Sequence, residues 1–147
     1  MDLRELFRHD RFARLTGVRL LEARAGYALA RMRVSDDSKN GLGVAQGGAV
    51  FTLADLAFAA ASNGAGQVAV AAQAGITFHK AGLGLLTAVA REVSRSRRLS
   101  ACEVVVTDRK GDRVATFQGL AYVKQENIQD LSPPRARRRG AARRARK

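Results

Sequence analysis

The chain has 147 residues and one cysteine, Cys102, a length that suits a single domain. One cysteine excludes an intrachain disulfide framework and a multi-cysteine zinc site. Aromatic residues make up 5% of the chain and Trp is absent, so we expect no stacking platform for single-stranded nucleic acid.

The formal net charge of +13 is unevenly distributed, because residues 135–147 hold eight Arg and Lys and no acid, which leaves +5 on residues 1–134. Pro133 and Pro134 break further pairing, and the segment after them has almost nothing apolar to bury. We therefore predict one domain over residues 1–131 and an Arg-rich, disordered tail over residues 132–147.

The N-terminus is charged from its second residue, Asp2, and lacks the apolar run of a signal peptide. No stretch combines the length and hydrophobicity of a membrane span. Together with the single cysteine, these features lead us to expect a cytoplasmic protein.

The first half of the chain predicts two helices and a strand. Residues 2–15 have the spacing of a short amphipathic helix. Side chains in residues 18–34 alternate with a period of two toward the end of the segment, which predicts one long strand. Residues 35–41 are rich in turn formers. Residues 49–64 are rich in Ala and Leu and apolar almost all round, so this helix must be enclosed by the rest of the protein.

The second half predicts four strands joined by turns. The alternating residues fall at 68–78, 85–93, 101–107 and 114–124. The expected fold class is α+β, with an antiparallel sheet wrapped around one long central helix. Residues 67–72 are apolar on both alternate faces, so we expect a second subunit to cover the face that the helix leaves open.

Thr52 and Asp55 are polar residues within the apolar helix, and their i, i+3 spacing puts them on one helix face. Burying a lone carboxylate is costly or drives its pKa upward. Two interpretations stay open at this point. Asp55 either lies on a narrow solvent-facing stripe, or it is a general base or nucleophile in a cleft.

Gly47 and Gly48 precede this helix. The first backbone N–H groups of a helix have no intrahelical partner and lie at the positive end of its dipole. Glycines let a ligand oxygen approach these groups closely. A substrate carbonyl could therefore contact the helix start while Asp55 acts on its carbon or on an attacking water.

The run Asn40-Gly41-Leu42-Gly43-Val44-Ala45-Gln46-Gly47-Gly48, continued to Leu53-Ala54-Asp55, resembles the signature of hotdog-fold acyl-CoA thioesterases of the PaaI-like, phenylacetate-degradation branch. Residues 76–78, the Arg97-Arg98 turn and residues 104–108 also match the strand pattern of that family. The resemblance covers roughly residues 15–124 and implies the hotdog fold.

The resemblance implies a role for each motif residue. Asp55 would be the catalytic carboxylate, as nucleophile or as general base. The Gly47 N–H would polarise the thioester carbonyl, and Asn40 would position the thioester or water. The family usually has His where this chain has Gln46, an amide that cannot titrate near neutral pH. Gln73 is the nearest candidate for a polar residue on the strand after the helix.

The resemblance also implies partners. The substrate is an acyl-CoA, and similar proteins form homodimers or homotetramers with shared sites. Gly48, Thr52 and Gln73 complete the expected substrate-binding set, together with three arginines for the CoA phosphates: Arg95, Arg97 and Arg98. These arginines could equally form a solvated charged turn. We expect no metal site and no cofactor, since CoA is part of the substrate and neither His9 nor His79 has a second ligand at metal spacing.

The favoured function is hydrolysis of an aryl- or fatty-acyl-CoA to free CoA and a carboxylate. One alternative is a non-catalytic protein that binds acyl-CoA, suggested by Gln46. The other is nucleic-acid binding through the basic tail, because Arg-rich segments bind phosphate backbones.

Overall fold

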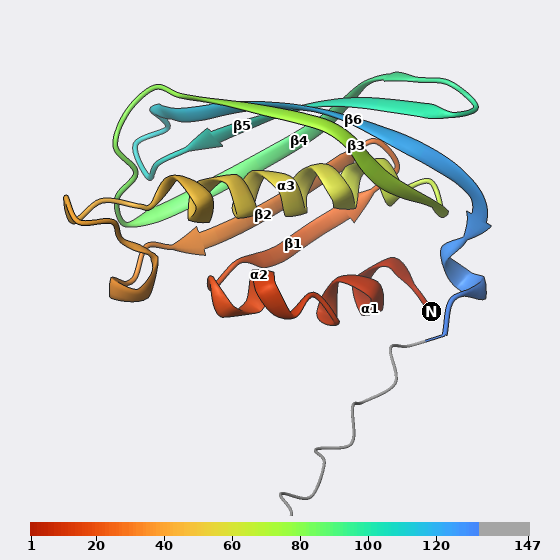
Figure 1. The fold of residues 1–147 in the computed structure, drawn as a ribbon, viewed down its shortest axis with the longest axis horizontal. Coiled ribbons are helices and arrows are strands. Elements are labelled where there is room, and N and C mark those ends of the chain that lie inside the picture. The colour runs from red at the N-terminus through yellow and green to blue at the C-terminus, as the bar shows by residue number, and fades with distance from the viewer. Residues whose placement is uncertain (133–147) are drawn as a thin grey trace, which may run out of the picture.

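The computed structural model describes residues 1–132 of the chain (Figure 1). The predicted Arg-rich tail, apart from Ser132, lies outside the described residues. Among the helices of residues 1–132, none is long and apolar enough to cross a membrane.

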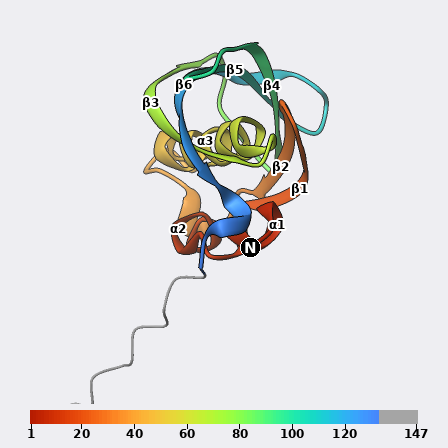
Figure 2. The same cartoon turned by 90° about the vertical axis from the view of Figure 1, so that its right-hand side faces the viewer.

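Six antiparallel strands form one sheet in the order β1-β2-β4-β5-β6-β3. The strands are β1 (Arg19–Arg24), β2 (Tyr27–Arg33), β3 (Gln67–Phe78), β4 (Leu85–Arg95), β5 (Leu99–Thr107) and β6 (Arg113–Asn127). The sheet curves around the long helix α3 (Gly47–Asn63), as the end-on view in Figure 2 shows. The predicted antiparallel sheet around one central helix is thus confirmed.

Small residues on the sheet let α3 pack closely against it. The Ala28 and Ala30 side chains of β2 face those of Ala88 and Ala90 of β4 in register, and all four are fully buried. On β6, a Cβ added at Gly119 would lie 2.8 Å from the ring of a helix phenylalanine. This close packing buries most of α3, as expected for an apolar helix.

The ends of α3 are fixed by side chains. Gln46 caps the first turn, as described below. At the other end, the Asn63 amide donates to the Ala59 and Ala69 carbonyl oxygens, each at 2.9 Å, and its oxygen accepts from the Ala69 N–H at 2.8 Å. This bonding ties the helix end to β3 and replaces backbone partners that helix ends lack.

The N-terminal segment is two short helices, where we predicted one helix over residues 2–15. Helix α1 (Leu3–Arg8) ends before Asp10, and α2 (Arg11–Leu15) begins after it. The Asp10 carboxylate accepts a hydrogen bond from the Ala13 N–H at 2.9 Å, so it caps a new helix and breaks the first one.

The prediction of one long strand over residues 18–34 is wrong, because the chain reverses there. Strands β1 and β2 pair as a hairpin, with Arg24 opposite Tyr27. The turn lies at Ala25–Gly26, and Gly26 has a φ of +68°, which favours glycine. The prediction extends the alternation of residues 28–34 back across Gly26, because a lone glycine can also occur within a strand.

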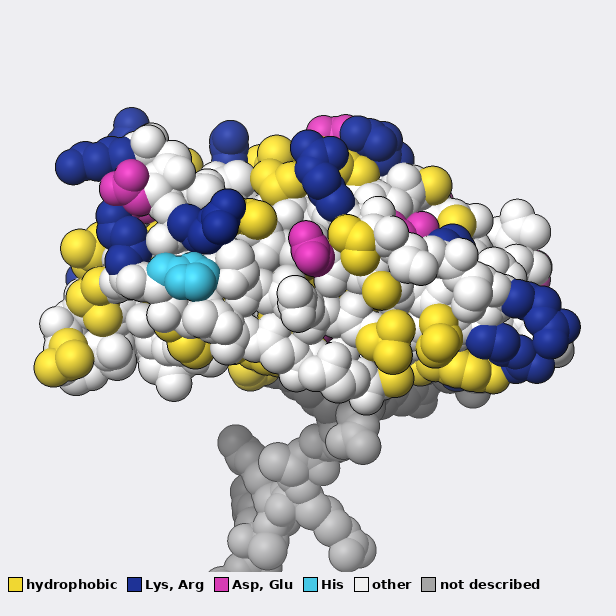
Figure 3. Space-filling view, turned by 90° about the horizontal axis from the view of Figure 1, so that it is seen from above, with side chains coloured by type: hydrophobic (Ala, Val, Ile, Leu, Met, Phe, Trp, Pro, Cys, Tyr) yellow, Lys and Arg dark blue, Asp and Glu magenta, His cyan; other side chains and the backbone are white. Residues whose placement is uncertain are grey.

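Strand β3 is an edge strand. Within residues 1–132 it pairs with β6 alone, and Val70, Ala71 and Ala72 are exposed. Cover by a second subunit therefore stays a prediction. Seen from above, the sheet mixes hydrophobic, cationic and uncharged side chains and shows no single charged field (Figure 3).

Candidate active site at the start of the central helix

Gln46 is the N-cap of α3. Its side-chain oxygen accepts a hydrogen bond from the Ala49 N–H at 3.1 Å. Gly48 leaves room for this bond, because a Cβ there would lie 2.8 Å from the Gln46 Oε1 atom. The amide that replaces the family histidine therefore has a structural role that requires no titration.

The backbone N–H groups of Gly47 and Gly48 donate to no acceptor within residues 1–132. They lie at the positive end of a 17-residue helix. A Cβ at Gly47 would lie 3.3 Å from the Phe78 ring, so a side chain there would crowd both the ring and any ligand. The helix start thus offers donors to a negatively charged oxygen.

Gly47 and Asn40 line the same pocket, which has a volume of about 370 Å³. The Asn40 Oδ1 atom accepts from the Leu42 N–H at 2.9 Å and from the Val44 N–H at 3.4 Å, which shapes the loop before the helix. Its amide Nδ2 has no acceptor within residues 1–132. Asn40 therefore combines a loop-forming oxygen with a free donor beside the Gly47 pocket.

Phe78, His79 and Lys80 form the opposite wall of this pocket at the end of β3. The His79 Nε2 atom lies 2.8 Å from the Thr116 Oγ1 atom. From the sequence alone, His79 is noted only as lacking a second metal ligand at suitable spacing. It is exposed, but it shares the pocket with the predicted site residues, a placement that the sequence did not reveal because β3 returns to the helix start only in three dimensions.

Lys80 is held by two carboxylates of the β5–β6 turn. Its Nζ atom lies 2.8 Å from Asp112 and 2.9 Å from Asp108. Hydrogen bonding to Asp112 and then to Asp108 raises the pKa of Lys80. Since the two carboxylates neutralise its charge, Lys80 holds the pocket wall in place and offers little positive charge to a ligand.

Asp55 lies on α3 but does not line the pocket of Asn40 and Gly47. It is eight residues after Gly47, which is about 12 Å along a helix axis. Burial raises the pKa of the Asp55 carboxyl, and the negative charge of Asp10 raises it further. Asp55 is neither fully buried nor exposed, and its catalytic role stays a prediction.

Asp55 belongs to one incompletely covered stripe of α3. The partly or fully exposed residues of the helix follow helical spacing at Gly47, Gly48, Phe51, Thr52, Asp55 and Ala59. The Thr52 hydroxyl donates to the Gly48 carbonyl oxygen at 2.8 Å, so its proton is used in a hydrogen bond within the helix. The stripe is the face of the helix that its own sheet leaves open.

The three predicted phosphate-binding arginines do not act as one cluster. Arg95 is turned inward, where its guanidinium donates to the Ser62 carbonyl oxygen at 3.1 Å and to Glu92 at 2.8 Å. This places it at the C-terminal end of α3. Arg98 donates to the Tyr122 hydroxyl, and Arg97 is exposed. Only these last two point toward solvent.

Gln73 is exposed on the edge strand β3, beside a register shift between Ala71 and Gln73. It does not line the Gly47 pocket. Among residues 1–132, no three His, Cys, Asp or Glu side chains are placed to hold a metal ion. Cys102 is buried, and burial raises the pKa of its thiol.

A six-stranded antiparallel sheet curved around one helix, with free N–H donors at the helix start, defines a hotdog-fold protein. Residues 42–115 match the model of the thioesterase superfamily. A protein of Archaeoglobus fulgidus is 33% identical over 129 residues, which is 86% of this chain and 84% of the relative. The chain therefore belongs to the thioesterase superfamily, as a PaaI-like thioester hydrolase.

Two further proteins support the PaaI-like assignment. The acyl-coenzyme A thioesterase PaaI of Escherichia coli is 29% identical over 119 residues, covering 80% of this chain and 85% of its own. Its solved structure has a TM-score of 0.79 and covers 83% of this chain and 90% of that one. A Streptococcus mutans protein solved with acetyl-CoA is 29% identical, with a TM-score of 0.71 over 75% of this chain and 90% of that one.

Proposed function

We propose that this protein is an acyl-CoA thioesterase that hydrolyses an aryl- or fatty-acyl-CoA to free CoA and a carboxylate. The observation that carries the proposal is the unpaired N–H group of Gly47 at the start of α3, in a pocket that Asn40 also lines. The name of the E. coli relative and the acetyl-CoA bound to the S. mutans protein support the choice of substrate.

In the proposed reaction, the thioester carbonyl oxygen accepts a hydrogen bond from the Gly47 N–H, and the helix dipole stabilises the negative charge that develops there. Asp55 acts as a carboxylate, either attacking the carbonyl carbon or removing a proton from the attacking water. The oxygen of water ends in the carboxylate product, the C–S bond breaks, and the thiol of CoA receives a proton. No cofactor takes part.

We propose further that each site draws on two copies of the chain, in a homodimer or homotetramer. The Asn40 and Gly47 pocket of one chain would receive Asp55 from its partner. In support, Asp55 of the same chain lies about two turns further along α3. The open stripe of α3 and the unpaired edge of β3 provide a surface for the second copy.

The remaining site residues have supporting roles in this proposal. Gly48 keeps the cap of α3 free of steric conflict, and Thr52 and Gln73 lie on the faces that the second copy would meet. Arg97 and Arg98 are the solvent-facing cations proposed to contact the CoA phosphates. Arg95 is left out, because its guanidinium is bound at the far end of α3.

Free-thiol release from a panel of aryl- and fatty-acyl-CoAs tests the proposal. We expect turnover of at least one member and its loss in Asp55→Ala. Binding of acyl-CoA with no hydrolysis of any panel member would instead favour the non-catalytic binding protein. Full activity in Asp55→Ala would contradict the assignment of the catalytic carboxylate.

A further inference from the structure

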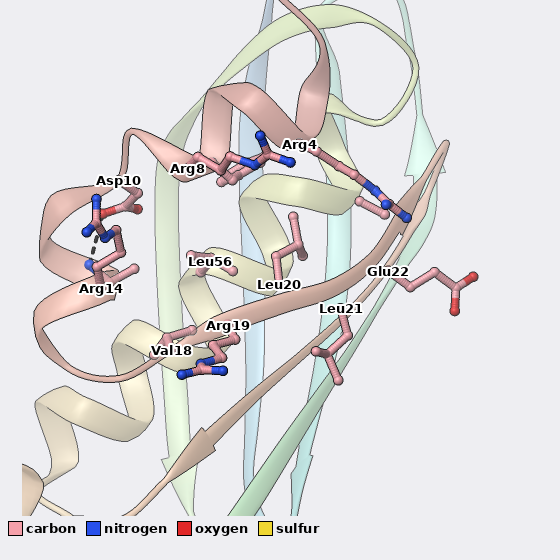
Figure 4. A pocket seen from close by; sticks show the side chains of 13 residues that line it. Arg4, Arg8, Asp10, Arg14, Val18, Arg19, Leu20, Leu21, Glu22 and Leu56 are labelled. Atoms are coloured by element: carbon pink, nitrogen blue, oxygen red, sulfur yellow. Dashed lines mark hydrogen bonds between the residues drawn. The ribbon is translucent and has the colours of Figure 1, made fainter.

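A second pocket lies between the two N-terminal helices and β1, and has a volume of about 570 Å³. It shares no lining residue with the pocket of Asn40 and Gly47. Figure 4 shows the space between α1, α2 and β1 into which the side chains of Leu20 and Leu56 project. Its size is within the range of small-molecule sites, about 300–1,000 Å³.

The floor of this pocket is apolar. Phe7 of α1, Leu20 of β1 and Leu56 of α3 contribute side chains from three separate elements. Leu56 is buried, and Phe7 and Leu20 pack against the same core. Apolar surface at the bottom of a hollow favours contact with hydrocarbon over contact with water. The floor therefore suits the hydrocarbon part of a ligand.

The rim of the pocket is cationic. Arg4 and Arg8 come from α1, Arg14 from α2 and Arg19 from β1. Within residues 1–132, none of these four guanidinium groups forms an ion pair. An anion at the rim would interact favourably with these unpaired guanidinium groups.

The two acids of the pocket, Asp10 and Glu22, form no ion pair with the rim arginines. Asp10 accepts the hydrogen bond that caps α2, from Ala13 at 2.9 Å. Glu22 pairs with Arg24 at 3.3 Å, outside the pocket lining. Four arginines against these two acids leave the pocket with an excess of positive charge over its apolar floor.

We propose that this pocket binds an amphiphilic anion, with its hydrocarbon tail on the floor and its carboxylate or phosphate head among the rim arginines. Guanidinium forks match the oxygens of both head groups. The shared chemistry is an anionic head on an apolar tail, whether a free fatty acid or an alkyl phosphate supplies it. The proposal concerns binding and does not depend on the hydrolytic activity.

Calorimetry on the full chain tests the proposal with three ten-carbon probes: decanoate, decyl phosphate and decyltrimethylammonium. The test variant is the double substitution Arg8→Gln with Arg14→Gln, which removes charge from two rim helices. The matched control is Arg109→Gln, an exposed arginine in the β5–β6 turn that lines neither pocket. Circular dichroism confirms that each variant is folded.

A second readout uses the absence of Trp from the chain. Leu21 lines the pocket wall and is 44% exposed, so Leu21→Trp introduces one fluorophore at the pocket without filling the core. Its emission should shift when an anionic probe binds. The same titration with saturating CoA distinguishes this pocket from the proposed active site.

We expect at least one of the two anionic probes to bind, and the one that binds identifies the head group. The double variant should weaken that binding about tenfold or more, since charge-assisted hydrogen bonds are lost, while Arg109→Gln changes it less than about twofold. Failure of both anions to bind would overturn the proposal. So would equal binding of the ammonium probe, equal weakening by the control, or displacement of the anion by CoA.

Discussion

The cap of α3 allows a quantitative test of the local structure at the proposed site. Gln46→Ala removes the hydrogen bond to the Ala49 N–H, and loss of an N-cap costs about 1 kcal/mol. Gly48→Ala adds a Cβ that would lie 2.8 Å from the Gln46 Oε1 atom. Because this atom is the end of a flexible side chain, it moves aside, and the cap is lost in that variant too.

The two substitutions should therefore be strongly non-additive. In Gly48→Ala, the loss of the cap is offset by the better helix propensity of Ala over Gly, about 1 kcal/mol at most, so the net change is close to zero. In the Gln46→Ala background no cap remains to be lost. Gly48→Ala then stabilises the protein, and the coupling free energy is about 1 kcal/mol.

Chemical denaturation followed by circular dichroism measures the four free energies of unfolding in this cycle. The double variant should be about as stable as the wild type, and Gln46→Ala alone about 1 kcal/mol less stable. A third variant, Gln46→His, asks whether the family residue also caps the helix. Strictly additive effects of the two substitutions would refute the reasoning, because they would show that Gly48 and Gln46 do not compete for the same space.

Three further predictions concern packing, titration and the tail. Gly119→Ala should destabilise the fold by about 1–3 kcal/mol through overpacking. The control Gly75→Ala, whose Cβ would lie 3.8 Å from its nearest neighbour, should not. Equal losses of stability in the two variants would contradict the close packing at Gly119. In a pH–rate profile, activity should rise as the pH increases through the elevated pKa of Asp55. Asp10→Asn should shift this rise to lower pH; an unchanged profile would show that the Asp10 charge does not raise the pKa of Asp55. Truncation after Ser132 should leave thiol release unchanged, and a loss of turnover with the fold intact would assign the tail a role.

The raised pKa of Asp55 also predicts how stability depends on pH. A group whose pKa is higher in the folded than in the unfolded protein stabilises the fold most below its ordinary pKa, and this stabilisation is lost as the pH rises through the folded value. Asp55→Asn should abolish this loss of stability at higher pH, because the amide carries no charge. The variant should therefore be more stable than the wild type at neutral pH and inactive, which denaturation and thiol-release assays together can show.

The sequence predicted the central helix and the last four strands well because their signals are local. Ala and Leu enrichment marks α3, and regular alternation marks β3 to β6. It did not predict the β1–β2 hairpin, because a lone glycine such as Gly26 can also occur within a strand, nor the break at Asp10, because a capping side chain decides it. Local chemistry of one or two residues decides both features.

The motif indicated that Asn40 and Gly47 lie close together but did not reveal what surrounds them, and the catalytic roles of these residues stay predictions. Asn40 and Gly47 do share a pocket, as the motif implied. His79 joins them only because β3 returns to the helix start, and Arg95 leaves the expected cluster because its guanidinium finds the carbonyl oxygen of Ser62. Contacts between distant segments carry no signature in a single sequence.

Subunit complementation tests the central claim, a hydrolytic site built from two copies, most directly. Asp55→Asn removes the carboxylate, and Asn40→Asp keeps the oxygen that bonds the Leu42 and Val44 N–H groups while removing the amide donor. Each variant alone should be inactive. After the two are unfolded and refolded together, random pairing gives dimers with one intact site, and thiol release should recover to about a quarter of the wild-type rate. Recovery of no activity, from variants that refold and pair, would contradict the shared site.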